Sequence, residues 1–135
     1  MPPSLDVASQ LSVTREDSRS VRTIEPERLL QELQSGRRIT LLDVRDPQEI
    51  RGLTGCIPGA RSLPLNELVT QRALPFCHPS EPIVVISGHG IRSRSASAEL
   101  EALGFTGVRS LEGGTSRWLE LGLSVEREAP SSGRF

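Results

Sequence analysis

Two short, mainly apolar runs lie along the chain between stretches of mixed polarity. Ile39–Val44 and Ile83–Ile86 are rich in β-branched residues and show no regular polar alternation, which is typical of strands covered on both faces. Val108–Leu111 has polar residues, Arg109 and Ser110, between two apolar ones and is predicted to be the last strand.

The segments between these runs favour helices. A helix is predicted after Pro26, because Leu29 and Leu33 share one face and Gly36 can end it. A longer helix is predicted over Ile91–Leu103, where apolar residues recur at helical spacing. Shorter helices are expected at Asn66–Thr70 and Ser116–Leu121, and the polar segment Arg45–Gly55 should hold one helical turn at most. Alternating strands and helices predict an α/β three-layer sandwich on a mainly parallel sheet.

Length and composition fit a single domain with polar ends. The chain has 135 residues, of which 36% are hydrophobic, enough for one compact core. We expect residues 1–20 to be a mobile N-terminal arm, residues 21–127 to form the domain, and residues 128–135 to be a C-terminal tail.

Charge and cysteine usage exclude several classes of function. A net charge of −1 argues against nucleic-acid binding, and no apolar stretch has the length of a membrane span. Cys56 and Cys77 form neither a disulfide framework nor a metal-ligand cluster, so we expect reduced thiols, no metal and no cofactor. The N-terminal segment lacks the features of a secretory signal, which favours a cytoplasmic protein.

The segment Ser87–Ser93 lies between a predicted buried strand and a predicted helix, where open parallel sheets bind ligands. Gly88 and Gly90 permit positive φ angles, so several N–H groups can converge on one point. The helix starting at Ile91 adds the positive end of its dipole. Two arginines lie at the rim of this loop, Arg92 and Arg94. An anion cradle and an ordinary glycine-rich turn are both consistent with this pattern.

The order of several motifs resembles the rhodanese homology domain over about residues 21–127. The motifs are Leu42-Asp43-Val44-Arg45, Glu49, Ile57-Pro58-Gly59-Ala60, Ile83–Ser93, Leu111-Glu112-Gly113-Gly114 and Trp118. Each motif alone is weak, whereas their order and spacing together are specific. The resemblance implies a central sheet of about five strands and the scaffold of a sulfurtransferase.

Ser87 stands where rhodaneses carry their catalytic cysteine. In the family, that thiolate faces a helix N-terminus, attacks a sulfane sulfur and carries it as a persulfide. A serine hydroxyl is not ionised near neutral pH and is a poor nucleophile toward sulfur. The resemblance therefore implies a loop that binds a small sulfur-containing anion or persulfide without transferring sulfur. This loop comprises Ser87, Gly88, His89, Gly90, Ile91, Arg92 and Ser93.

Other chemistries are less favoured. Cys56 replaces the family histidine before Ile57 and should lie near the loop, but its sulfur should not be surrounded by the N–H groups of the loop. Cys77 lies before the Ile83–Ile86 strand, whereas the loop lies after it. Ser87, His89 and Asp43 are the residue types of a hydrolase triad, but the G-x-S-x-G pattern is absent. The spacing from Ser87 to Arg92 matches sulfurtransferases, since phosphatases of this fold use a longer loop.

Two explanations of Ser87 remain open. It is either natural, in a pseudoenzyme that binds an anion, a persulfide or a protein partner, or a Cys→Ser substitution introduced into an active sulfurtransferase. We favour the first, because Cys56 and Cys77 remain in the chain.

The remaining motif residues have structural interpretations. Asp43 and Arg45 are expected to form an ion pair or to cap a neighbouring loop, and so to support the site. Trp118 is expected in the core, and Glu49 on the surface of a helical turn.

Overall fold

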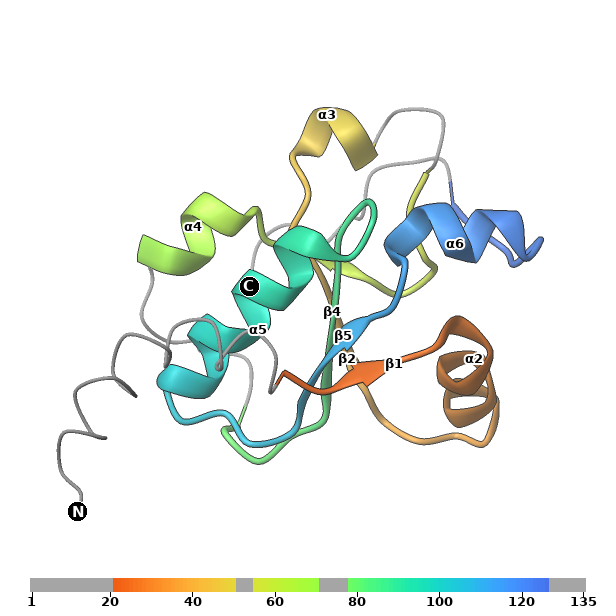
Figure 1. Ribbon diagram of the computed structural model, residues 1–135. Helices are drawn as coiled ribbons and strands as arrows, with labels where there is room; N and C mark the ends of the chain where they lie inside the picture. Colours follow the sequence, from red (N-terminus) through yellow and green to blue (C-terminus); the bar gives the residue numbers. More distant parts are fainter. Residues whose placement is uncertain (1–20, 51–54, 71–77, 127–135) are drawn as a thin grey trace, which may run out of the picture.

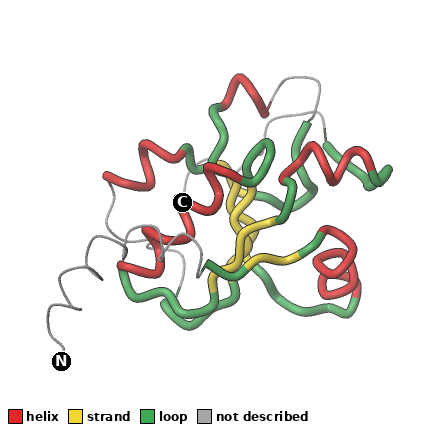
Figure 2. Tube along the Cα trace, in the orientation of Figure 1, coloured by secondary structure: helices red, strands yellow, loops and turns green. Residues whose placement is uncertain are grey.

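The computed structural model describes residues 21–50, 55–70 and 78–126 of the chain. Its five-stranded sheet has the order β1-β5-β4-β2-β3, and every neighbouring pair of strands is parallel. The strands are β1 (Thr23–Ile24), β2 (Thr40–Asp43), β3 (Arg61–Ser62), β4 (Ile83–Ile86) and β5 (Val108–Leu111). The helices are α2 (Pro26–Gln34), α3 (Pro47–Ile50), α4 (Leu65–Thr70), α5 (Ile91–Ala102) and α6 (Gly114–Glu120). Figures 1 and 2 show the helices around the sheet, which confirms the predicted α/β class.

Alternate residues of β4 face two separate cores. Ile83 and Val85 pack with residues of α4 and α5, whereas Val84 and Ile86 pack with residues of α2 and α6. All four side chains are fully buried. Because helices cover both faces of the sheet, β4 needs an apolar residue at every position, which explains the unbroken run in the sequence. The three-layer arrangement is therefore as predicted.

The two edge strands were not predicted as strands. β1 and β3 have two residues each and are defined by their partners, β5 and β2. A two-residue segment is too short for a period-2 pattern to be visible, so only the pairing in three dimensions reveals it.

The predicted helices are all present, with small changes at their ends. The first helix ends before Gly36, whose φ is 88°. The last helix begins at Gly114 rather than at the predicted Ser116. Gly113 forms the N-cap of α6 with a φ of 74°. No helix in the described ranges is long and apolar enough to cross a membrane.

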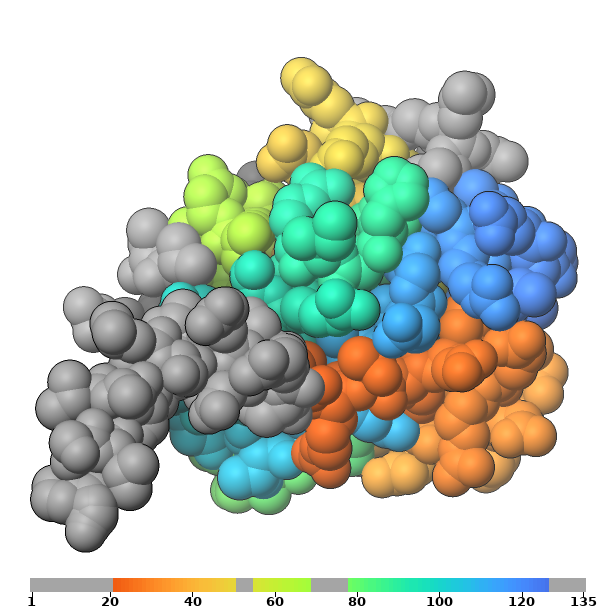
Figure 3. Space-filling model, viewed as in Figure 1, coloured from red at the N-terminus to blue at the C-terminus, as the bar shows by residue number. Residues whose placement is uncertain are grey.

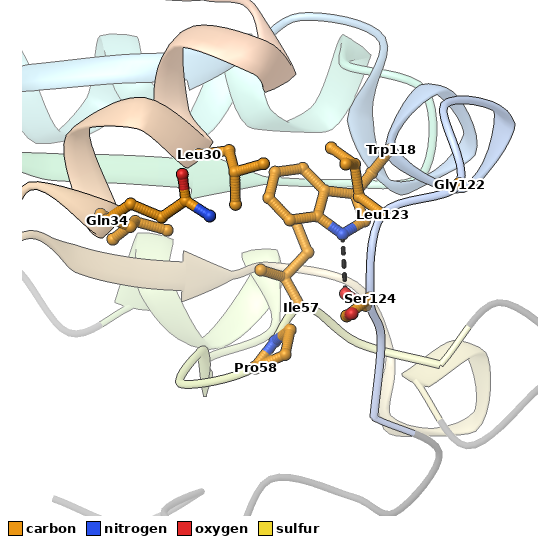
Figure 4. Close-up of a pocket in the computed structure, with 9 residues that line it drawn as sticks. Leu30, Gln34, Ile57, Pro58, Trp118, Gly122, Leu123 and Ser124 are labelled. Carbon is orange, nitrogen blue, oxygen red and sulfur yellow. Dashed lines mark hydrogen bonds between the residues drawn. The ribbon is translucent and has the colours of Figure 1, made fainter.

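Trp118 anchors α6 in the core, as expected from the sequence. Its side chain is 2% exposed, and its Nε1–H donates to the carbonyl oxygen of Ser124 at 2.8 Å. Figure 4 shows the indole ring beside a mainly apolar pocket between α2, α6 and the turn at Ile57. The pocket is lined by Leu30, Leu33, Gln34, Ile57, Pro58, Trp118, Gly122, Leu123 and Ser124.

Candidate functional site

Strand β4 leads directly into a tight loop that begins at Ser87 and lies between α3 and α6 (Figure 1). The first turn of α6 holds this loop, because the N–H groups of Thr115 and Ser116 donate to the carbonyl oxygens of Ser87 and Gly88 at 2.9 and 3.0 Å. This approach requires glycine at position 114, since a Cβ on Gly114 would collide with both carbonyl groups. The loop is therefore fixed by β4, α5 and α6 together.

The two glycines of the loop have different roles. Gly90 has a φ of 99° and forms the N-cap of α5, as predicted. Gly88 has no positive φ, so the prediction is wrong for this residue. A Cβ on Gly88 would lie 3.4 Å from Nη2 of Arg92, at ordinary van der Waals contact, so the guanidinium group lies beside this residue.

The Ser87 hydroxyl uses its full hydrogen-bonding capacity inside the protein. Its Oγ accepts hydrogen bonds from the N–H groups of Gly90 and Ser93 at 3.0 and 3.1 Å, and it donates to Oγ of Ser93 at 3.1 Å. A hydroxyl has one hydrogen to donate and two lone pairs, so no capacity remains. The residue is fully buried. Ser87 therefore caps α5, which the N-cap glycine cannot do with a side chain.

The hydrogen-bond chain continues from Ser93 into the sheet. Oγ of Ser93 lies 2.7 Å from Oγ of Ser110 on β5, and both residues are buried. Ser93 was predicted as part of the loop, but Ser110 was not. Nothing in the sequence pairs two serines seventeen positions apart, because only the packing of α5 on β5 brings them together.

Four N–H groups of the loop have no acceptor in the part of the chain that the structure describes. They belong to Gly88, His89, Ile91 and Arg92. The side chains of His89 and Ile91 are exposed, Ile91 to 73%, so this end of α5 faces solvent. Unpaired N–H groups and the positive end of the helix dipole coincide here, a combination that suits a small anion.

The arginines at the rim are paired with carboxylates. Arg92 donates to Glu49 with both ends of its guanidinium group, Nη1 to Oε1 at 2.7 Å and Nη2 to Oε2 at 2.9 Å. Arg94 lies farther from its partner, with Nη2 3.8 Å from Oε2 of Glu112. Glu49 was predicted to be an ordinary surface residue, and its role is missed because it lies 43 positions from Arg92.

The Glu49 carboxylate is held by two elements. Oε1 also accepts a hydrogen bond from the N–H of Asp46 at 2.9 Å, which ties Glu49 to the residue before α3. The Arg92 hydrogen bond is the main cause that lowers the pKa of Glu49 below its usual range, against a smaller opposing effect of burial. Glu49 is thus an anion at neutral pH.

Asp43 and Arg45 form the expected ion pair at the end of β2. Nη2 of Arg45 lies 2.8 Å from Oδ2 of Asp43, and the side chains are 2% and 0% exposed. The same Nη2 donates to the carbonyl oxygen of Gly55 at 2.7 Å, so the pair also caps a neighbouring segment. Asp43 pairs with Ile86, the residue before Ser87, which places this ion pair next to the loop.

The structure does not assemble a hydrolase triad. The Asp43 carboxylate is occupied by Arg45, and the Ser87 hydroxyl is bonded to Ser93. No hydrogen bond joins His89 to Ser87 among the described residues. The residue types of a triad are therefore present without its geometry.

Cys56 is buried, at 1% exposure, and its N–H and carbonyl groups form a bridge with Glu126. Burial is the main cause that raises the pKa of its thiol, with the nearby Asp43 charge as a second cause. A buried, protonated thiol is a poor nucleophile. Cys77 lies outside the described residues.

The family model of the rhodanese-like domain matches residues 25–121. The chain belongs to the rhodanese-like family. The thiosulfate sulfurtransferase GlpE of Ectopseudomonas mendocina is 37% identical over 91 residues, which cover 65% of this chain and 76% of GlpE. The crystal structure of a rhodanese-related protein from Thermoplasma volcanium matches with a TM-score of 0.68 and 31% identity, over 79% of this chain and 99% of that one.

A longer relative contains a similar rhodanese-like segment. The probable adenylyltransferase/sulfurtransferase MoeZ of Mycobacterium tuberculosis is 33% identical over 96 residues, which cover 71% of this chain. The chain spans only 24% of the length of MoeZ. The resemblance that the motif order predicted is thus confirmed at the level of the family.

Proposed function

We propose that this rhodanese-like domain binds a small anion at the loop between β4 and α5 and does not transfer sulfur, so that it acts as a binding or regulatory module. The observation that carries the proposal is the saturated hydroxyl of Ser87, at the position where the family resemblance implies a cysteine. A nucleophile needs a free lone pair and access to its substrate, and this buried Oγ has neither.

The chemistry of oxygen supports the absence of sulfur transfer. A carrier must be ionised, attack a sulfane sulfur and hold it in a bond that a second thiol can break. Ser87 stays a neutral alcohol at physiological pH. The charged side chains near the loop are paired with one another, Arg92 with Glu49 and Arg45 with Asp43. No described base contacts the Ser87 hydroxyl, since its partners are N–H groups and another serine.

Anion binding rests on the backbone. The four unpaired N–H groups of Gly88, His89, Ile91 and Arg92 lie at the N-terminus of a helix of twelve residues. Such groups stabilise negative charge without any ionisable donor. A sulfur-containing oxyanion or the terminal sulfur of a persulfide matches this chemistry, and a protein partner that presents an acidic group would use the same donors.

A second function follows if Ser87 is an introduced substitution. The domain would then be a thiosulfate or persulfide sulfurtransferase with its carrier atom removed. The printed activity of its relative GlpE, a thiosulfate sulfurtransferase, favours this candidate. In this candidate, a cysteine at position 87 would supply the sulfur carrier that the serine lacks.

The deciding experiment compares the chain with its Ser87→Cys variant. Both are incubated with thiosulfate and cyanide, and thiocyanate is measured. Ser97→Cys is a matched control, because it places the same thiol at a different buried serine, which lies within α5 and outside the loop. We expect no turnover by the unaltered chain or by Ser97→Cys. Thiocyanate production by the unaltered chain would overturn the proposal, and turnover by Ser87→Cys alone would favour an intact sulfurtransferase site.

Anion binding is tested separately by titrating the unaltered chain with thiosulfate while recording amide NMR spectra. The amides of Gly88 and His89 should shift most, because they have no internal acceptor, and that of Gly90 should shift less because Ser87 already accepts its hydrogen. Unchanged Gly88 and His89 amides would count against the loop as an anion site.

A further inference from the structure

The ion pair between Glu49 and Arg92 lies beside the loop between β4 and α5. Glu49 comes from α3 and Arg92 from the first turn of α5, and Figure 3 shows these elements side by side at one end of the molecule. The side chains are 41% and 37% exposed. Nη2 of Arg92 also lies 3.4 Å from where a Cβ of Gly88 would be, so the guanidinium group lies over the start of the loop.

This position makes Arg92 the cation best placed for a ligand on the loop. Side chains in the first turn of a helix point back toward its N-terminus, and here toward the unpaired N–H groups. Arg94 is held more loosely, 3.8 Å from Glu112, and the buried Arg45 is fully engaged with Asp43 and Gly55. Of these three, Arg92 is the one that is partly exposed and whose Nη2 lies beside Gly88 at the start of the loop.

Glu49 occupies the donors that such a ligand would use. A guanidinium group binds a carboxylate and a tetrahedral oxyanion with the same pair of parallel N–H donors. Both carboxylate oxygens of Glu49 are engaged, at 2.7 and 2.9 Å. The carboxylate therefore acts as an internal anion that neutralises Arg92 beside the loop.

We propose that Glu49 is a specificity-determining residue that competes with the ligand for Arg92 and so selects for oxyanions able to replace a bidentate carboxylate. The inference rests on the proposed anion-binding function and deepens it. A thiosulfate or sulfate ion has the oxygens to take both hydrogen bonds, whereas a chloride ion offers a single acceptor point. Chloride should therefore be excluded more strongly by the ion pair than a tetrahedral oxyanion.

The test measures thiosulfate affinity by NMR titration of the unaltered chain and of matched variants. Glu49→Gln removes the competing charge while keeping an acceptor for the N–H of Asp46. We expect it to bind thiosulfate about fivefold more tightly, the scale of a half-exposed ion pair. Glu99→Gln removes an exposed negative charge elsewhere on α5 and should leave the affinity unchanged.

The double variant Glu49→Gln with Arg92→Gln tests whether the gain acts through Arg92. The gain should disappear in this variant, and its amide spectrum shows whether it is folded. Equal affinities for the unaltered chain and Glu49→Gln, or a gain that persists in the double variant, would overturn the role of Glu49 while leaving anion binding intact. If thiosulfate binds none of these proteins, the proposed function fails and this inference fails with it.

Discussion

The Oγ atoms of Ser87 and Ser93 lie 3.1 Å apart in the buried centre of the domain. Ser93 also gives its N–H to the same Ser87 oxygen and contacts Ser110 on β5. The loop, the helix that follows it and the sheet are thus joined by hydroxyl groups. In a buried chain of this kind, loss of one hydroxyl takes a partner from each of its neighbours, which costs more than the bond itself.

The variant Ser93→Ala should therefore be destabilised by about 2 kcal/mol, because the hydroxyls of Ser87 and Ser110 both lose a partner. The free energy of unfolding is measured in urea. Ser95→Ala is the control, since Ser95 lies two residues away on the exposed face of the same helix. Equal stabilities for the two variants would show that the hydroxyl chain contributes little.

Ser97→Ala should have the opposite effect. The Ser97 hydroxyl is buried, and its Oγ has no hydrogen-bond partner among the described residues. Removing an unsatisfied buried hydroxyl relieves its desolvation cost, and alanine favours helices, so we expect a gain of about 1 kcal/mol. The same urea titration measures it, and a clear loss of stability would indicate a partner for this hydroxyl.

Gly114→Ala should disrupt the contact between α6 and the loop. Its φ is 61°, and an added Cβ would collide with the carbonyl oxygens of Ser87 and Gly88. Gly122→Ala measures the cost of a positive φ angle without a steric collision, because Gly122 has a φ of 75° and open space around its Cβ position. We expect about 1 kcal/mol of destabilisation for Gly122→Ala and at least about 3 kcal/mol for Gly114→Ala. Stability is measured by thermal unfolding, and equal unfolding temperatures for the two variants would contradict the steric argument.

The carboxylate of Glu32 on α2 forms ion pairs with three arginines. Glu32 is 7% exposed, and Arg109 donates to its two carboxylate oxygens at 2.8 and 3.1 Å, while Arg28 and Arg37 approach from α2 and the segment after it. The Arg109 hydrogen bonds are the main cause that lowers the pKa of Glu32 from 4.5 to about 2, and desolvation opposes them.

The stability of the domain should therefore fall in acid. A group with a lowered pKa in the folded state stabilises it fully above the unfolded pKa of 4.5, and this contribution is lost as the pH falls toward 2. Glu32→Gln should lose about 2 kcal/mol at pH 7 and show a weaker dependence on pH below 4.5. Glu27→Gln, an exposed change in the same helix, is the control. Parallel pH profiles of unfolding for the unaltered chain and Glu32→Gln would contradict this assignment.

Much of the fold follows from local patterns in the sequence. Ile83–Ile86 is apolar at every position because helices cover both sheet faces, and this pattern correctly predicted a central strand. α2 carries an apolar stripe and is followed by Gly36, and α5 is followed by Gly104, so both helices were placed to within a residue or two, although the buried face of α5 includes Ser93 and Ser97. The position of the loop between β4 and α5 was predicted because the strand before it and the helix after it were both predicted.

The rest of the site depends on contacts between distant parts of the chain. The partnership of Glu49 with Arg92 and that of Ser93 with Ser110 arise only when α3 and β5 pack around α5. The conformation of Gly88 was mispredicted, because glycine permits a positive φ angle without requiring it. The residue types thus indicated where the loop lies, whereas tertiary packing decides which of its polar groups remain available to bind a ligand.

The burial of Trp118 has a practical consequence for these measurements. The chain contains one tryptophan and no tyrosine, so its near-ultraviolet emission comes almost entirely from a single indole ring. That ring lies on α6, the helix whose first turn holds the carbonyl groups of Ser87 and Gly88. Its fluorescence therefore reports, without any attached label, on whether the helix that secures the loop is docked.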